Sequence, residues 1–509
     1  MWNHDRLQLF ENGIVRTLDP ANPVGSWVLV EGGKVLRVGR GQALVSSAVE
    51  RFDLGGRALV PGFTDAHVHL TWMATSFMGP DLSGSENVES VLAAVRAWQG
   101  EGRGENGDWI AGDGFDESTW TDKHLPTRHE IDAVEKGRPV LVRRVCGHVG
   151  VLNSQALARL APGPHTNADT GRIAETDLWA LNDRLRPSPE QLARVLPRVF
   201  ALLHGHGITA VHDVISAEML RALQMQRDRS LLPLRVSCSL PADRLEAIRT
   251  CGFQSGFGDE WLGVLGIKVF VDGSLGARTA WLRESYSDEP TTRGTPLYSQ
   301  EDLAALFAAG DAAGVQLMIH AIGDAALERV LDCMPPHIAA SNPLRHRLEH
   351  IEVTPPDLVR RLSASGLHAC VQPNFAGRWS QPGGMNEQRL GSRLPHCNAY
   401  RALADAGVPL GFGSDCMPLG ALDGLRAAVR HPDAAQRLDP LQALDLYTRA
   451  AAFLRRGETV HGQIRRGLAA DFALLSHDPG TEAGLAHARV EATFLAGARV
   501  GGGVPGGER

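Results

Sequence analysis

Residues 60–70 read VPGFTDAHVHL, an apolar run that ends in the pair His67 and His69. Successive side chains of a strand point to opposite faces, so these two imidazoles would project to the same side. An α/β barrel places its active site at the carboxyl ends of its strands, where both imidazoles can reach one metal ion. The pair alone is weak evidence, because the chain contains 20 histidines.

Further apolar runs follow along the chain, and most are separated by Ala/Leu-rich stretches such as EDLAALFAAGDAAG that are typical of helices. We predict eight buried strands, at about residues 62–70, 209–214, 234–240, 265–272, 315–322, 346–353, 368–373 and 409–415. Strands that alternate with helices indicate a parallel sheet, and eight of them indicate closure. The predicted fold class is therefore α/β, a (β/α)₈ TIM barrel.

The two ends of the chain show short alternating runs with turns. Residues 1–60 include SWVLVEGGKVLRVG, where Gly32-Gly33 is a hairpin signal, and residues 455–509 return to the same pattern. We expect these segments to pair into one small β-sandwich beside a barrel of residues 61–454. The stretch of about 71–208 is too long for a simple crossover, so we expect an insertion that forms part of the substrate-facing surface.

Four more strand ends carry side chains of metal-ligand type: Lys268 in LGIKVFVDG, His320 after VQLMI, His350 after RHRLE and Asp415 after PLGFGS. Lysine is almost never buried unpaired, so Lys268 either pairs with a carboxylate or has reacted with CO₂ to form a bridging carbamate. A lone histidine here is more often a hydrogen-bonded core residue, but several such ends in order favour one shared site. Imidazole and carboxylate suit zinc and similar divalent ions.

Asp415 has a second role available. A carboxylate beside a metal-bound water can take its proton and later give it to a leaving group. The metal would lower the pKa of that water from 15.7 to about 7 and polarise a carbonyl oxygen. Together these groups supply what hydrolysis needs, without a serine or cysteine nucleophile.

The order HxH, Lys, His, His, Asp on strands one, four, five, six and eight resembles the amidohydrolase superfamily. Within it, the chain is similar to the amidohydrolase family 3 group, which includes N-substituted formamide deformylases. Stretches along nearly the whole chain carry the similarity, among them GDWIAGDGFDESTW, GIKVFVDGSLGARTAWL, RLEHIEV and GLAADFALLSHDP.

The resemblance implies roles for all six candidates. His67 and His69 would bind a first metal, and a carboxylated Lys268 would bridge. His320 and His350 would bind a second metal, while Asp415 would bind metal and act as acid and base. Some members of the family keep a single ion, so the number of ions, one or two, stays open.

Five other residues are candidates for substrate contact. His148 and Asn153 stand in GHVGVLN, where the group has a similar GH-x-x-x-x-N pattern, and a structural turn is an equal alternative. Asp272, Ser274 and Arg278 follow the lysine strand in DGSLGAR, so we expect their loop on the catalytic rim.

Composition narrows the class of protein. The net charge of -7 and the pI near 6.3 do not indicate a surface that binds nucleic acid. We find no apolar run near the roughly 20 residues that span a bilayer and no signal-peptide pattern. We therefore expect a cytoplasmic protein that acts on a small molecule, without a membrane partner. Dimers are the commonest assemblies, so a homodimer is compatible with the sequence, which does not fix the oligomeric state.

Three hypotheses follow. We favour a metal-dependent hydrolase of a non-peptide C–N bond, in a linear amide such as an N-substituted formamide or N-acyl compound. A lactone or carboxyl-ester hydrolase would use the same centre, because attack at any activated carbonyl needs the same groups. A non-catalytic metal- or ligand-binding protein is the third, against which Asp415 argues, because a binding protein has less need of that base.

Overall fold

A computed structural model of the chain describes residues 7–43, 49–98, 100, 107–117, 120–122, 124–145 and 149–502. The chain divides into two compact units. The larger unit comprises Met1–His69, Phe200–Ser216 and Arg227–Val504, and the smaller comprises Leu70–Val199, Ala217–Gln226 and Pro505–Arg509. His148, a candidate for substrate contact, lies outside the described residues.

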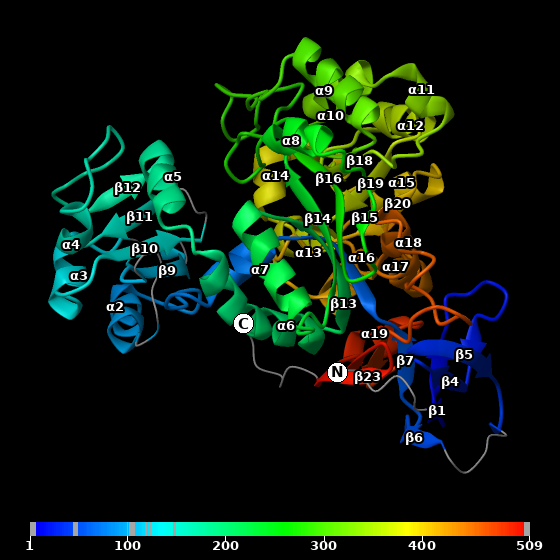
Figure 1. The fold of residues 1–509 in the computed structure, drawn as a ribbon. Helices are drawn as coiled ribbons and strands as arrows, with labels where there is room; N and C mark the ends of the chain where they lie inside the picture. The colour runs from blue at the N-terminus through cyan, green and yellow to red at the C-terminus, as the bar shows by residue number, and fades with distance from the viewer. Residues whose placement is uncertain are drawn as a thin grey trace. The chain divides into compact units, whose positions relative to one another are not determined.

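The larger unit contains eight parallel strands in the spatial order β8-β13-β14-β16-β17-β18-β19-β20 (Figure 1). Their bounds are Phe63–Val68, Ile208–Val214, Arg235–Pro241, Leu262–Phe270, Gln316–Ala321, Arg347–His350, His368–Val371 and Leu410–Phe412. The first and last strands meet where the Asp415 N–H donates to the His67 carbonyl at 2.8 Å. The fold is therefore α/β with a nearly closed, TIM-like barrel.

The strands form where they do because both of their faces are covered. Every residue of β8, β17, β18, β19 and β20 is buried. Parallel strands buried on both faces have largely apolar sequences, which is the pattern of most of these strands, although β18 reads RLEH. Several polar exceptions, such as His67, His320 and His350, lie toward the carboxyl ends, and others, such as Gln316 and His368, begin their strands.

Helices connect the strands and set where the next strand begins. In α9, the Ser299 side chain accepts the Asp302 N–H at the N-terminus, and Gly314 ends the helix at φ 67°. The α-helices within the larger unit are α8 (Leu245–Thr250), α9 (Gln300–Ala313), α10 (Asp324–Cys333), α11 (Pro336–Ala340), α12 (Pro356–Ser365), α13 (Pro373–Trp379), α14 (Met385–Leu390), α15 (Tyr400–Asp405), α16 (Ala421–Val429), α17 (Pro440–Leu446), α18 (Arg449–Leu454) and α19 (Glu482–His487).

Two further sheets in the larger unit use both ends of the chain. One has the order β5-β4-β1-β6, with bounds Lys34–Gly39, Trp27–Glu31, Gln8–Glu11 and Glu50–Asp53. The other has the order β23-β22-β21-β7-β2-β3, with bounds Ala498–Gly502, Val490–Leu495, Phe472–Leu475, Ala58–Pro61, Ile14–Arg16 and Val24–Gly25. Gly32 and Gly33, at φ 59° and 75°, form the expected turn between β4 and β5.

The two sheets share one hydrophobic cluster. Phe10 of β1 lies edge-on to Phe472 of β21 and Phe494 of β22, with ring centroids 5.4 and 5.0 Å apart. Strand β7 pairs antiparallel with β21, so the two ends of the chain meet in one sheet. That the two sheets form one sandwich domain stays a prediction.

The smaller unit has a sheet of its own, in the order β12-β11-β10-β9. The bounds are Arg172–Ala174, Val149–Leu152, Val140–Arg144 and Ile110–Phe115, and the helices are α1 (Leu70–Ser76), α2 (Val88–Ala97), α3 (Arg128–Val134), α4 (Ser154–Leu157) and α5 (Glu175–Arg184). Helices α6 (Pro189–Gly205) and α7 (Ala217–Asp228) cross the boundary between the units. Among the described residues, no helix is long and apolar enough to cross a membrane.

Candidate metal centre

Six side chains meet at the carboxyl ends of the barrel strands. They are the six candidates from the sequence: His67, His69, Lys268, His320, His350 and Asp415. His67 is central, because its Nε2 lies 3.3 Å from Lys268 Nζ and 3.8 Å from Asp415 Oδ1. His69 Nε2 lies 2.9 Å from the same Asp415 oxygen. The His350 ring centroid is 4.8 Å from that of His67 and 4.5 Å from that of His320.

Burial favours the neutral form of three of these imidazoles, whereas Asp415 raises the pKa of His69. Burial, followed by the charge of Lys268, lowers the pKa of His67 to about 4 and the pKa of His320 to about 3. Burial also lowers the pKa of His350 well below its ordinary value, and the neighbouring His320 adds to this. Neutral imidazole, with a free lone pair, is the form that binds a metal ion.

His320 provides a test of whether a metal fits. Its Nε2 lies 2.9 Å from the Gly273 carbonyl oxygen, which can only accept, so Nε2 carries the proton. Its Nδ1 is buried and has no hydrogen-bond partner within the described residues. A buried lone pair without a partner is costly, and a divalent ion would satisfy it. The donor set and this orphaned atom both fit a metal.

Two other ligand candidates are oriented by acceptors on their far sides. His67 Nδ1 lies 2.5 Å from Glu349 Oε2, and His350 Nδ1 lies 2.8 Å from Gln372 Oε1. Each contact places the ring proton on Nδ1 and leaves Nε2 as the lone-pair nitrogen. Such acceptors behind metal-binding histidines fix the tautomer and the ring orientation.

Lys268 is 2% exposed and forms no ion pair within 4.0 Å among the described residues. The alternative of a direct pair with a carboxylate is therefore not realised there. Burial lowers the pKa of Lys268 to about 8, against the opposing charges of Glu349 and Asp415. A lowered pKa increases the fraction of the amine that is neutral at a given pH, and the neutral amine is the form that reacts with CO₂.

The backbone around the centre is strained. Asp415 and Cys416 have φ of 52° and 60°, and His350 and Ile351 have φ of 71° and 41°. Residues other than glycine in the left-handed region persist only where their surroundings force them to, and they cluster at active sites. The turn of Asp415 is held by its N–H bond to His67 and by the bond of the Ser414 N–H to Asp65 at 2.8 Å.

Sequence reasoning missed Glu349, which is fully buried beneath His67. Arg347 Nε donates to Glu349 Oε1 at 2.6 Å, and the same guanidinium donates to the Ala66 carbonyl at 2.9 Å. Burial would raise the pKa of Glu349, but Arg347 and His67 together lower it to about 2. A signal was present in the sequence, since RLEH places two charges on one face of a buried strand.

Two of the candidates for substrate contact bind the backbone of their own unit. Asp272 is 1% exposed, and its carboxylate accepts N–H bonds of 2.8–3.0 Å from Trp281, Ile322 and Gly323. Asn153 caps α4, where its side-chain oxygen accepts the N–H groups of Val140 and Ala156 at 2.9 Å. The bonds of Asn153 match the structural alternative.

Ser274 and Arg278 lie in the loop after β16, next to Gly273, whose carbonyl contacts His320. The Ser274 hydroxyl accepts the Ala277 N–H at 3.3 Å, and Arg278 pairs with Asp288 at 2.9 Å. The loop therefore reaches the rim of the barrel, as expected. The substrate contacts of these residues stay predictions.

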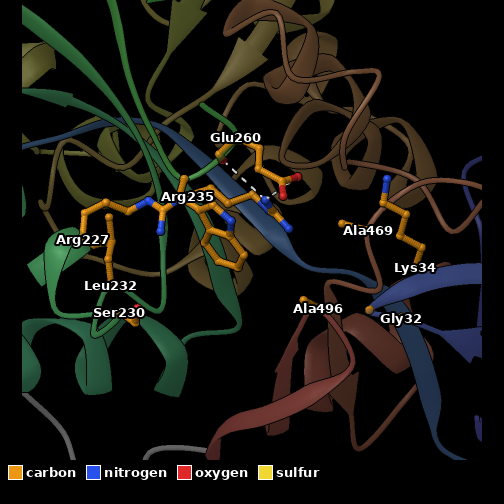
Figure 2. Close-up of a pocket in the computed structure, with 11 residues that line it drawn as sticks. Gly32, Lys34, Arg227, Ser230, Leu232, Arg235, Glu260, Ala469 and Ala496 are labelled. Carbon is orange, nitrogen blue, oxygen red and sulfur yellow. Dashed lines mark hydrogen bonds and ion pairs between the residues drawn. The ribbon is translucent and has the colours of Figure 1, made fainter. Parts of the chain in front are cut away.

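A cavity of about 230 Å³ lies at the other end of the barrel, where β14 and β16 begin (Figure 2). Figure 2 shows Arg235 beside Glu260. These two side chains pair at 3.2 Å, and Arg235 also pairs with Asp471 at 2.6 Å. Arg227, on the same wall, pairs with Asp259. These cations are already neutralised, and the amino-terminal face of such barrels serves stability.

Comparison with known proteins agrees with this geometry. A model described as "Amidohydrolase family" matches residues 50–500. The chain is 28% identical to the putative amidohydrolase YtcJ of Bacillus subtilis, over 92% of this chain and 94% of that protein. It is 27% identical to an N-substituted formamide deformylase of Arthrobacter pascens, over 92% and 93%. The crystal structure of an uncharacterized metal-dependent hydrolase from Pyrococcus furiosus superimposes with a TM-score of 0.80 at 26% identity, covering 93% of this chain and 100% of that one.

Proposed function

The chain belongs to the amidohydrolase family of metal-dependent hydrolases, and we propose that its substrate is a linear amide, an N-substituted formamide or N-acyl compound, cleaved at a non-peptide C–N bond. The observation that carries the proposal is the meeting of four histidines, one lysine and one aspartate at one rim. Lactone or carboxyl-ester cleavage at the same centre is the alternative.

Each residue has a role in this proposal. His67 and His69 would hold one divalent ion, His320 and His350 would hold a second where two are bound, and a carboxylated Lys268 would supply an anionic oxygen ligand. Nitrogen and oxygen ligands of this kind make zinc the ion we favour. When bound, such an ion would lower the pKa of water from 15.7 to about 7 and would polarise the carbonyl.

Asp415 moves the proton. Its carboxylate is 7% exposed and faces the His67 and His69 nitrogens, so it would be placed to accept a proton from water activated at the centre. The nitrogen of an amide is a poor leaving group unless it is protonated, and Asp415 would return the proton to that nitrogen. An ester has a better leaving group and depends less on this second transfer.

The experiment combines metal analysis with an amide panel. Protein purified without chelator should contain a divalent metal by ICP-MS and should hydrolyse linear amides faster than matched esters, relative to their uncatalysed rates. Asp415→Asn should lower kcat by about 10²- to 10⁴-fold and keep the fold, because Asn tolerates positive φ. Asp259→Asn, at the amino-terminal ends of the strands, is the matched control. Absence of metal, or full activity in Asp415→Asn, would contradict the proposal.

A further inference from the structure

Arg455 follows α18 at the end of the barrel opposite the candidate metal centre. The Leu454 carbonyl before it accepts a hydrogen bond from Nε2 of Gln316, the first residue of β17, at 3.5 Å. In the turn after it, the His461 N–H donates to the Gly457 carbonyl at 2.9 Å. The backbone is therefore held on both sides of Arg455, at the amino-terminal ends of the strands.

The Arg455 guanidinium is buried and bonds to a neutral side chain. The residue is 9% exposed, and its Nη1 lies 3.2 Å from His461 Nε2. A guanidinium only donates, so this nitrogen of His461 accepts, and the ring proton is on Nδ1, 3.4 Å from the Thr64 hydroxyl. Burial lowers the pKa of His461 well below its ordinary value, so His461 does not share in balancing a charge.

A buried carboxylate at this end of the barrel is already used by other groups. Asp471 pairs with Arg235 at 2.6 Å and accepts the Ala496 N–H at 2.8 Å. Among the residues that the structure describes, no carboxylate lies within 4.0 Å of the Arg455 guanidinium. A buried charge without a counter-ion is costly, so a group from outside the chain would stabilise this one.

The guanidinium has one edge, formed by Nε and Nη2, that receives no acceptor from the chain. In Arg16, both nitrogens of this edge donate to the carboxylate of Asp478. In Arg227, they both donate to Asp259. In Arg455, Nε is buried without a partner and Nη2 has no hydrogen bond within the described part of the chain. The edge that holds an anionic side chain in the other arginines is thus directed at something else.

We propose that this edge of Arg455 binds a compact monovalent anion, such as chloride or formate, which stabilises the amino-terminal end of the barrel. An anion accepts both N–H groups and balances the charge, whereas water would satisfy the hydrogen bonds alone. Since so little of the residue is open, a large anion such as gluconate does not fit. The site is at the far end of the strands from the metal centre, and it does not depend on the proposed hydrolase function.

The first test measures the melting temperature of the protein as purified, at constant ionic strength, while chloride replaces gluconate. In wild type it should rise by about 2–4 °C and level off once chloride exceeds Kd about 100-fold, because a ligand of the folded state stabilises it. Arg455→Met removes the charge at similar length and should lose this rise. Arg465→Met, at an exposed arginine of the same segment, should keep it. A formate series distinguishes the two anions: a rise with either supports the site, and a rise with neither overturns it.

The second test locates the anion directly. Crystals of wild type soaked in bromide should show an anomalous peak at hydrogen-bonding distance from Nε and Nη2 of Arg455. This measurement and the wild-type titrations decide the matter if Arg455→Met does not fold. Density there without anomalous signal, in a protein that does not respond to formate either, would identify a water molecule and overturn the proposal. A bromide peak in a protein whose melting temperature does not depend on chloride would mean an adventitious ion only, which overturns it as well.

Discussion

At the scale of single residues, His67 connects the reacting centre to the barrel interior. Its Nε2 faces Lys268 and Asp415, while its Nδ1 bonds to Glu349, which Arg347 holds in turn. A ligand held from behind by a charged pair keeps one tautomer and one orientation. The charge of Glu349 should therefore influence how strongly the centre holds a metal.

Glu349→Gln tests this influence. Glutamine keeps the size of the side chain and an acceptor oxygen for His67, but it removes the charge and leaves Arg347 without its counterion. We expect the metal affinity to fall about 10- to 100-fold, measured by competition with a chromogenic chelator. Glu458→Gln, which breaks the part-exposed pair with Arg345, is the control. Unchanged metal affinity would mean that the charge of Glu349 does not influence metal binding.

Lys268 predicts a dependence on pH. Burial brings its pKa to about 8, so about a tenth of the amine is neutral at pH 7, against less than about 0.1% at the ordinary pKa. At constant dissolved CO₂, carbamate formation in metal-free protein should speed up by about tenfold per pH unit below 8 and level off above it. ¹³C NMR with labelled bicarbonate follows the reaction, and Lys268→Arg should lack the signal. A rate that does not change with pH would contradict the assignment.

At the scale of elements, most of the barrel strands could be predicted because they lie in largely apolar runs, although β18 reads RLEH. The ends of the strands were harder to predict. The strand expected at 346–353 stops at His350 because His350 and Ile351 take positive φ, and residue types alone do not reveal this. The proximity of the six candidate residues could be predicted because strand ends of a parallel barrel share one rim; their role as a metal centre stays a prediction. Glu349 was not predicted, because its partner His67 is 282 residues away in the sequence and their contact depends on how the strands are placed.

The two accessory sheets give a prediction about elements. Phe10 and Phe494 come from different sheets and pack edge-on at 5.0 Å. If the sheets form one sandwich, a double-mutant cycle of Phe10→Leu and Phe494→Leu should show a coupling of about 0.5–1.5 kcal/mol in the free energy of unfolding. Phe10→Leu with Phe307→Leu, on α9, should be additive. No coupling between Phe10 and Phe494 would mean that the two sheets are stabilised independently.

At the scale of the whole molecule, the buried histidines of the centre contribute to how the fold responds to acid. The pKa values of His67 and His320 are about 4 and 3 in the folded protein, whereas unfolded histidine titrates near 6.5. Between these values the unfolded chain binds more protons than the folded one, so stability falls as the pH falls. Glu349, with a pKa of about 2, adds a loss below about 4.5, because its charged form stabilises the fold.

We therefore expect the melting temperature of metal-free protein to drop between about pH 6.5 and 4. Metal binds the folded state, and at 100 times Kd it should add about 2.7 kcal/mol to the free energy of unfolding near pH 7.5. Protons compete with the ion for the same imidazoles, so this increment should shrink over the same pH range. Calorimetry with and without chelator at four pH values measures both effects. His320→Asn should flatten the acid dependence, since it removes one buried group that takes up a proton on unfolding. A melting temperature that changes with neither chelator nor acid would mean that these side chains do not jointly bind an ion.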